Sequence, residues 1–226
     1  MTSDEAIRKS INDIELRIEE ALWDEMDDEN RERELERYTE ARAALEDLEC
    51  PSPDLERERA RVLSYCLMRI DETLVNLGNT EDALVRAREA LDMGKLSEDP
   101  VQIARCHLAL GVRYLNNGQL EEADSHWHEV FKLAEGQEKN DDMQQVLGWT
   151  LLARAHVAKA KSLYDQALHL AKGAEGRLLQ VDNYAGLAPV YELMKDLYGA
   201  LGQPEKIEWA EKMSDHYKDL AKTKRR

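Results

Sequence analysis

Residues 103–134 carry the sequence IARCHLALGVRYLNNGQLEEADSHWHEVFKLA, which decides the fold. Apolar residues recur every three or four positions on both sides of a central turn signal, a pattern typical of two amphipathic helices. The first helix places Leu108, Gly111 and Tyr114 on one face. Asn116-Asn117-Gly118 is a helix stop, because Asn and Gly tolerate the left-handed backbone that ends a helix. We therefore predict a helical hairpin.

This hairpin resembles the tetratricopeptide repeat (TPR), whose usual length is about 34 residues. The family has a small residue seven places before the turn glycine and an aromatic residue four before it. It has alanine five after the turn, an aromatic residue nine after and alanine twelve after. The corresponding residues here are Gly111, Tyr114, Gly118, Ala123, Trp127 and Val130, of which only Val130 departs from the pattern.

Weaker copies of the same series surround Gly78, Ala155 and Gly202. Together with Gly118 they predict turns that are 40, 37 and 47 residues apart, longer than the usual repeat. The resemblance covers roughly residues 53–220 and implies an all-α protein. We predict an α-solenoid of three to four TPR-like helical hairpins of the longer-repeat type, with an N-terminal helical cap.

The N-terminal residues 4–27 carry a heptad seam, an apolar series with alternating spacings of four and three. Its members are Ile7, Ile11, Ile14, Ile18, Ala21 or Leu22, and Met26. One interpretation is a hairpin that caps the repeat stack, and the other is a coiled coil through which two copies dimerise. We favour the cap, because the ends of a solenoid need covering. The run Tyr38–Ala41 also looks like part of a degenerate leading repeat.

Proline and its neighbours mark the boundaries. Ser52 and Asp99 are good N-caps, and Pro53 and Pro100 suit the first position of a helix. We predict a helical hairpin or cap over residues 1–50, a repeat domain over 53–222 and a basic tail over 223–226.

Two helices of about 141–154 and 157–172 are expected to form the third copy. Residues 177–201 keep one apolar face that Pro189 interrupts. Because the face continues in phase across the proline, we predict a single kinked helix there.

Composition excludes several functions. The net charge is −16, and the first 60 residues hold 21 acidic and 9 basic side chains, so −12 of it lies there. Such acidity opposes nucleic-acid binding. The sequence has neither a long apolar run nor a signal-like N-terminus, so we predict no membrane span. The odd number of cysteines predicts reduced thiols in the cytoplasm, with Cys66 and Cys106 in the core.

No residue pattern predicts chemistry. His126 and His128 point in different directions on a helix, so they do not share a metal ion. His107, His156 and His169 are isolated on helices, and no nucleophile, metalloprotease or nucleotide-binding motif is present. We predict a non-enzymatic protein without a cofactor or metal.

The TPR resemblance also implies a concave groove, lined by the first helices of successive repeats, that holds a peptide or a partner helix. Its positions lie 13, 10, 6, 3 and 2 residues before each turn. The predicted lining residues are Tyr65, Met68, Glu72, Asn76, Arg105, Leu108, Val112, Leu115, Asn116, Gln145, Trp149 and Leu152. Some members of the family clamp a peptide carboxylate with Lys and Asn. Here the corresponding places hold Met68, Glu72, Leu108 and Val112, so that clamp is absent.

We therefore predict an interaction scaffold that binds a peptide or an amphipathic helix of another protein, with Trp149 at the centre of an apolar groove. One alternative is a homodimeric structural spacer that assembles through residues 4–27. The other is a small-molecule sensor or an enzyme with a pocket near Pro189, which would involve Tyr184, Tyr191 and His156.

Overall fold

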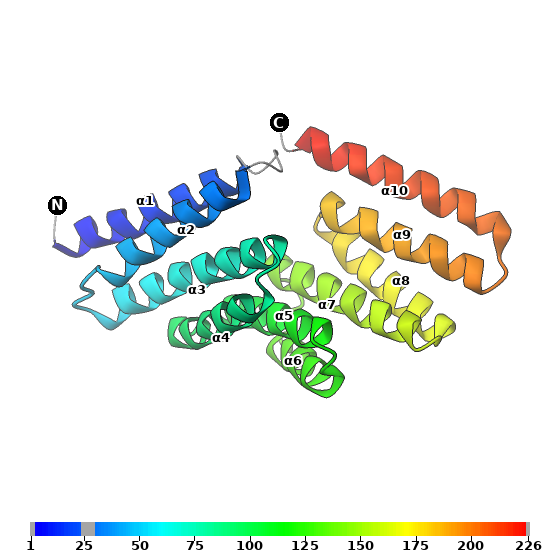
Figure 1. Cartoon of the computed structure of the whole chain (residues 1–226), viewed down its shortest axis with the longest axis horizontal. Helices are drawn as coiled ribbons and strands as arrows, with labels where there is room; N and C mark the ends of the chain where they lie inside the picture. The colour runs from blue at the N-terminus through cyan, green and yellow to red at the C-terminus, as the bar shows by residue number, and fades with distance from the viewer. Residues whose placement is uncertain (1–2, 24–29, 225–226) are drawn as a thin grey trace. The chain divides into compact units, whose positions relative to one another are not determined.

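The structure, a computed structural model, describes residues 3–23 and 30–224. Every regular element in these ranges is an α-helix (Figure 1), so the prediction of an all-α protein is confirmed. Met26 of the predicted seam lies outside the described residues, as do Arg225 and Arg226 of the predicted tail.

The chain divides into two compact units, Met1–Gly118 and Gln119–Arg226. The helices described in unit 1 are α1 (Ser3–Trp23), α2 (Arg31–Glu46), α3 (Pro53–Asn76), α4 (Thr80–Ser97) and α5 (Pro100–Asn116). The helices described in unit 2 are α6 (Leu120–Leu133), α7 (Asp141–Ala160), α8 (Tyr164–Gln180), α9 (Tyr184–Ala200) and α10 (Pro204–Lys224).

Helix α3 is the centre of unit 1, because it contacts α1, α2, α4 and α5 (Figure 1). The isoleucines of the heptad seam belong to this core: Ile11, Ile14 and Ile18 are buried with residues of α2 and α3. The apolar stripe of α1 is therefore covered within its own unit.

In unit 2, α7 packs on α8 and α9 packs on α10, while α8 also contacts α9 (Figure 1). The core combines small and large side chains, with Ala155, Ala167 and Ala171 buried in one cluster with Leu187 and Tyr191. Small residues let the helices approach closely. A Cβ atom at Gly148 would lie 2.6 Å from Cγ of Leu178, so only glycine fits on α7 where α8 crosses it.

Both predicted helix starts are confirmed. The Ser52 hydroxyl accepts a hydrogen bond from the N–H of Leu55, and the Asp99 carboxylate accepts from the N–H groups of Val101 and Gln102. Each cap satisfies donors that a helix leaves free in its first turn. The prolines at the first position lose nothing there, because that N–H has no partner inside the helix.

Glycine ends the first helix of three hairpins. Gly78, Gly118 and Gly202 have φ values of 82°, 76° and 66°, a conformation that costs glycine little. At Gly78 the N–H donates to the Val75 carbonyl, and the next N–H, of Asn79, donates to the Leu74 carbonyl. This pair of bonds is the Schellman motif, which satisfies carbonyls left open at a helix end.

The predicted turn at Ala155 is wrong. Ala155 lies inside α7, fully buried, and the corner falls at Ser162, whose φ is 60°. The corner has the same bonds as at Gly78, from Ser162 to Lys159 and from Leu163 to Ala158. The helices are therefore 141–160 and 164–180, and the corners at 78, 118, 162 and 202 are 40, 44 and 40 residues apart.

A repetition in the sequence explains this error. Small residues recur every seven positions here, as Gly148 and Ala155 in α7 and as Ala160, Ala167 and Ala174 later. Seven residues make about two helical turns and restore the same face. The TPR series therefore fits at Ala155 as well as at Ser162.

The single helix predicted over residues 177–201 is also wrong. Residues 177–180 end α8, and a corner at Asp182, with a φ of 52°, precedes α9. The Asn183 side chain then caps α9 by accepting from the N–H of Gly186 at 2.8 Å. Helix α9 continues through Pro189, as expected. The apolar face spans both helices because the end of α8 and the whole of α9 border one core.

Candidate functional site

The predicted lining residues fall on three first helices of the hairpins. In unit 1 they form what we call the α3–α5 face: Tyr65, Met68, Glu72 and Asn76 on α3, and Arg105, Leu108, Val112, Leu115 and Asn116 on α5. The two sets occupy equivalent places, because the corners Gly78 and Gly118 are 40 residues apart, as are the paired positions. Helices α3 and α5 are in contact, so the structure brings the two sets together.

The apolar members of the α3–α5 face are half-buried, namely Tyr65, Met68, Leu108, Val112 and Leu115. Glu72, Asn76 and Asn116 are exposed, toward the corner ends of the helices. The face thus combines apolar contact area with polar groups at one end. This is the composition of protein-binding surfaces, where an apolar centre is bordered by polar residues.

Arginine borders the apolar part of this face. The Arg69 guanidinium lies 5.4 Å from the centre of the Tyr65 ring and pairs with Glu72 at 2.9 Å. Burial raises the pKa of the Tyr65 phenol, so this group stays protonated at neutral pH and can donate a hydrogen bond.

A buried ion pair ties α3 to α5 in the same unit. The Arg113 Nε–H donates to both carboxylate oxygens of Asp71, at 2.8 and 3.1 Å. The side chain of Asp71 is 2% exposed and that of Arg113 is 14% exposed. Burial raises the pKa of Asp71 to about 6, although the charge and the hydrogen bonds of Arg113 favour the ionised form.

Sequence reasoning noted Asp71 only as a departure from the repeat pattern, since the family has a small residue at that place. The unexpected carboxylate was nevertheless a signal, because a buried charge requires a partner. Its partner Arg113 lies 42 residues away, and no local pattern connects the two.

Beside this pair, polar side chains of α3 and α5 form a small buried cluster. The Gln102 amide donates to Ser64 Oγ at 3.0 Å, and the Ser64 hydroxyl donates to the Ala90 carbonyl at 2.7 Å. Cys106 lies in this cluster, where burial raises the pKa of its thiol to about 11. Cys66 is buried too, so both cysteines lie in the core as predicted.

On α7 in unit 2, the structure separates the three predicted residues. Leu152 is 4% exposed and belongs to the core, so it supports the surface from below. Trp149 is half-buried and packs beside Gly186 of α9. Gln145 borders a pocket of about 290 Å³ that also includes Asn183 and Tyr184.

The corrected corner at Ser162 changes which α7 residues are equivalent to the α3–α5 face. Counting back from it gives Trp149, Leu152, His156, Lys159 and Ala160. Trp149 and Leu152 remain because the error was seven residues, and Gln145 drops out. Lys159 pairs with Asp196 of α9 at 2.5 Å, and burial lowers the pKa of His156.

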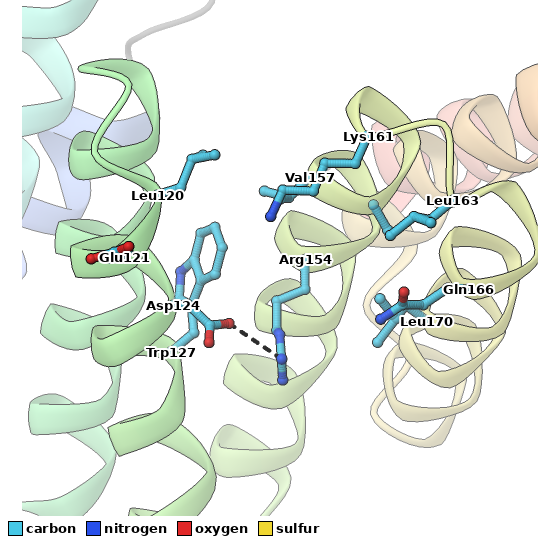
Figure 2. A pocket seen from close by; sticks show the side chains of 11 residues that line it. Leu120, Glu121, Asp124, Trp127, Arg154, Val157, Lys161, Leu163, Gln166 and Leu170 are labelled. Carbon is cyan, nitrogen blue, oxygen red and sulfur yellow. Dashed lines mark ion pairs between the residues drawn. The ribbon is translucent and has the colours of Figure 1, made fainter.

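Unit 2 also contains a pocket of about 470 Å³ between α6, α7 and α8 (Figure 2), which we call the α6–α7–α8 pocket. Its lining residues are Leu120, Glu121, Asp124, Trp127, Arg154, Val157, Ala158, Lys161, Leu163, Gln166 and Leu170. Sequence reasoning did not find this pocket, because it depends on how α6 packs against the next hairpin.

The pocket has apolar and charged walls. Trp127 is 2% exposed, and its Nε1–H has no hydrogen-bond acceptor among the described residues. Arg154 of α7 pairs with Asp124 of α6 at 3.2 Å (Figure 2), and its guanidinium lies 5.6 Å from the centre of the Phe131 ring. The ion pair joins the two helices that border the pocket.

The residues suggested for an enzymatic pocket near Pro189 serve packing. The Tyr191 phenol donates to the Glu175 carboxylate, and its ring stacks on Tyr217 with a centroid distance of 5.5 Å. Burial raises the pKa of Tyr191. The pocket beside Tyr184 is the separate one that Gln145 borders.

In the described part of the chain, His, Cys, Asp and Glu side chains form no group of three or more that suits a metal ion. None of the helices described between residues 3 and 224 is long and apolar enough to cross a membrane.

No family model matches the sequence, and no curated protein matches it in sequence. Solved structures are similar in fold. The Rap conjugation gene regulator of the plasmid pLS20, in complex with the Phr* peptide, has a TM-score of 0.71 at 15% identity, over 98% of this chain and 57% of the regulator. Aspartyl phosphate phosphatase F from Bacillus subtilis has a TM-score of 0.64 at 20% identity, over 83% and 46% of the two chains.

The TPR-like repeats of a Podosopora anserina kinesin light chain have a TM-score of 0.53 at 13% identity, over 100% of both chains. The chain thus spans about half the length of the Rap regulator and of the phosphatase. At these identities the likeness concerns the fold alone, which is an all-α, TPR-like helical-repeat fold.

Proposed function

We propose that this protein is a non-enzymatic interaction scaffold and that its α3–α5 face binds an amphipathic peptide or helix of another protein. The observation that carries the proposal is the set of half-buried apolar side chains at equivalent places on two successive first helices. Grooves of this kind hold helices through apolar anchors spaced three or four residues apart.

The comparisons support this proposal at the level of the fold. The Rap regulator with a similar fold was solved with a peptide bound to it. A prebuilt helical surface binds with little ordering cost on its own side, which favours recognition of short segments. For the present chain, the ligand chemistry comes from its own residues.

Those residues favour an apolar ligand over an acidic C-terminal tail. The places of the carboxylate clamp hold Met68, Glu72, Leu108 and Val112, so a free carboxylate would find no lysine there. Tyr65 and Arg105 provide donors beside the apolar part of the face. We expect a ligand that presents two or three large apolar side chains and no terminal carboxylate.

We propose no catalytic activity, although one protein of similar fold is named a phosphatase. The strongly shifted groups described above hold helices together. Asp71 is paired with Arg113, and Tyr191 is bonded to Glu175. A cytoplasmic location stays a prediction that rests on the free cysteines.

The homodimer through residues 4–27 stays an alternative prediction. Ile11, Ile14 and Ile18 are buried inside unit 1, so such a dimer would require α1 to leave α2 and α3. Light scattering at micromolar concentration tests it, since a monomer would eliminate a spacer built on dimers.

A displayed library of random 16-residue peptides, selected on the full chain, tests the proposed function. We expect selected peptides to lose at least about tenfold in affinity for Leu108→Asp, because apolar anchor sites dominate such interfaces. Val85→Asp on α4 is the matched control, since Val85 is 42% exposed in the same unit but lies off the face. Equal binding by wild type and Leu108→Asp would contradict the proposal.

A further inference from the structure

We propose that unit 2 carries a second interaction site, in which the α6–α7–α8 pocket receives an apolar side chain from an amphipathic segment of a partner protein. The segment would present a basic side chain toward α6 and an acidic side chain toward the end of α7. This site differs from the α3–α5 face, because two of its three helices, α6 and α8, are the second helices of their hairpins.

Exposed leucines at the mouth of the pocket are the first argument. Leu120 at the start of α6 is 40% exposed, and Leu163 just before α8 is 49% exposed. Figure 2 shows them on opposite sides of the pocket, with the Trp127 ring between α6 and α7. Large apolar side chains that gather in this way mark interaction surfaces.

The size and openness of this arrangement favour a protein segment. A volume of about 470 Å³ accommodates one or two side chains together with part of their main chain. A small molecule inside the pocket would leave the outer parts of Leu120 and Leu163 in water. A partner surface would cover both, as the border of a protein interface does.

Charge defines the orientation of the partner. Asp124 and Arg154 neutralise each other, which leaves Glu121 on the α6 side and Lys161 at the end of α7. Neither Glu121 nor Lys161 has an ion-pair partner among the residues that the structure describes. Figure 2 places them on opposite sides of the pocket. A partner with the complementary pair of charges would therefore bind in one direction only.

The same peptide selection, made on the full chain and read out with variants of unit 2, tests this inference. Leu163→Asp is the main variant. Leu163 occupies the N-cap position of α8 without a side-chain cap bond, and aspartate is favourable there, so the helix is preserved. The matched control is Leu179→Asp, since Leu179 is 41% exposed on the same helix but does not line the pocket.

We expect one class of selected peptides to lose at least about tenfold in affinity for Leu163→Asp and to be unchanged by Leu179→Asp and by Leu108→Asp. Lys161→Glu should weaken the same peptides about tenfold, and exchanging their acidic residue for lysine should restore binding. This rescue depends on a direct charge contact, which a general loss of folding would not produce.

Three results would overturn the inference. The first is that every selected peptide responds to Leu108→Asp and none to Leu163→Asp, which would leave the proposed function intact. The second is equal weakening by Leu163→Asp and Leu179→Asp. The third is a dimer in light scattering that Leu163→Asp abolishes, which would assign the pocket to a second copy of this chain.

Discussion

The hairpins α3–α4 in unit 1 and α7–α8 in unit 2 have the same plan but different interiors. Seven residues before the corner, α3 carries Asp71 and α7 carries Ala155, and both side chains are buried. Unit 1 holds α3 against α5 with the ion pair to Arg113, whereas unit 2 brings α7 and α8 together through small residues such as Gly148.

The comparison teaches that one position of a repeat can be filled by two kinds of interaction. A buried ion pair depends on the presence of both partners, because removal of one leaves an uncompensated charge. Close packing depends on shape alone, because an added methylene meets atoms that have nowhere to move. We therefore expect the stability of unit 1 to respond to charge and pH, and that of unit 2 to respond to volume.

The largest effect is expected from Arg113→Ala. This change leaves the Asp71 carboxylate buried without its partner, which costs about 3–5 kcal/mol in comparable cases. Urea unfolding at pH 8, followed by circular dichroism, measures the loss. The loss should shrink at pH 5, because the protonated Asp71 no longer needs a cation.

Asp71→Asn is the control for this interpretation, through its pH dependence. The pKa of Asp71 is raised to about 6 in the folded state from an ordinary 3.8, so the folded state binds the proton more tightly. The contribution of Asp71 to the free energy of unfolding therefore falls as the pH rises from about 4 to about 6. Asp71→Asn should remove this part of the pH dependence, and an unchanged profile would contradict the assignment.

An intermediate effect is expected in unit 2 from Gly148→Ala. The new Cβ atom would lie 2.6 Å from Cγ of Leu178, so α7 and α8 must separate, which costs about 1–3 kcal/mol. Gly176→Ala on α8 is the matched control, because nothing lies within 4 Å of its Cβ position. The control should stabilise the helix by about 0.5–1 kcal/mol. Thermal unfolding of the two variants should give shifts of opposite sign.

The smallest effect is expected at the corners. Ser162 has a φ of 60°, which costs a side-chain-bearing residue about 1 kcal/mol. Ser162→Gly should therefore stabilise the protein by up to about 1 kcal/mol, and Gly78→Ala, with a φ of 82° at the start, should destabilise it by a similar amount. Chemical unfolding of both variants checks the pair, and a loss of stability in Ser162→Gly would mean that the corner is not strained.

These corners also show how far the sequence determines the fold. Ser52 with Pro53 and Asp99 with Pro100 are local signals, and they correctly mark where α3 and α5 begin. Glycine marks the corners at 78, 118 and 202. Ser162 and Asp182 adopt the same left-handed conformation without glycine, so the sequence reveals neither corner.

The candidate sites follow the same division. The α3–α5 face follows from repeat spacing, because equivalent residues on equivalent helices occupy the same side. The α6–α7–α8 pocket depends on how Trp127 and Arg154 come together, and neither residue carries a local sign of that contact. Leu120 and Leu163 have the expected apolar character, but only the folded chain shows that they remain exposed.

The ion pair between Asp71 and Arg113 has a consequence for the order of assembly. During synthesis, α3 and α4 leave the ribosome before α5, so Asp71 is made before its partner exists. The carboxylate then stays hydrated, and the surface around it remains open until α5 arrives. The docking of α5 is therefore a late closing step for unit 1, and a chain interrupted within residues 100–113 would leave this step undone.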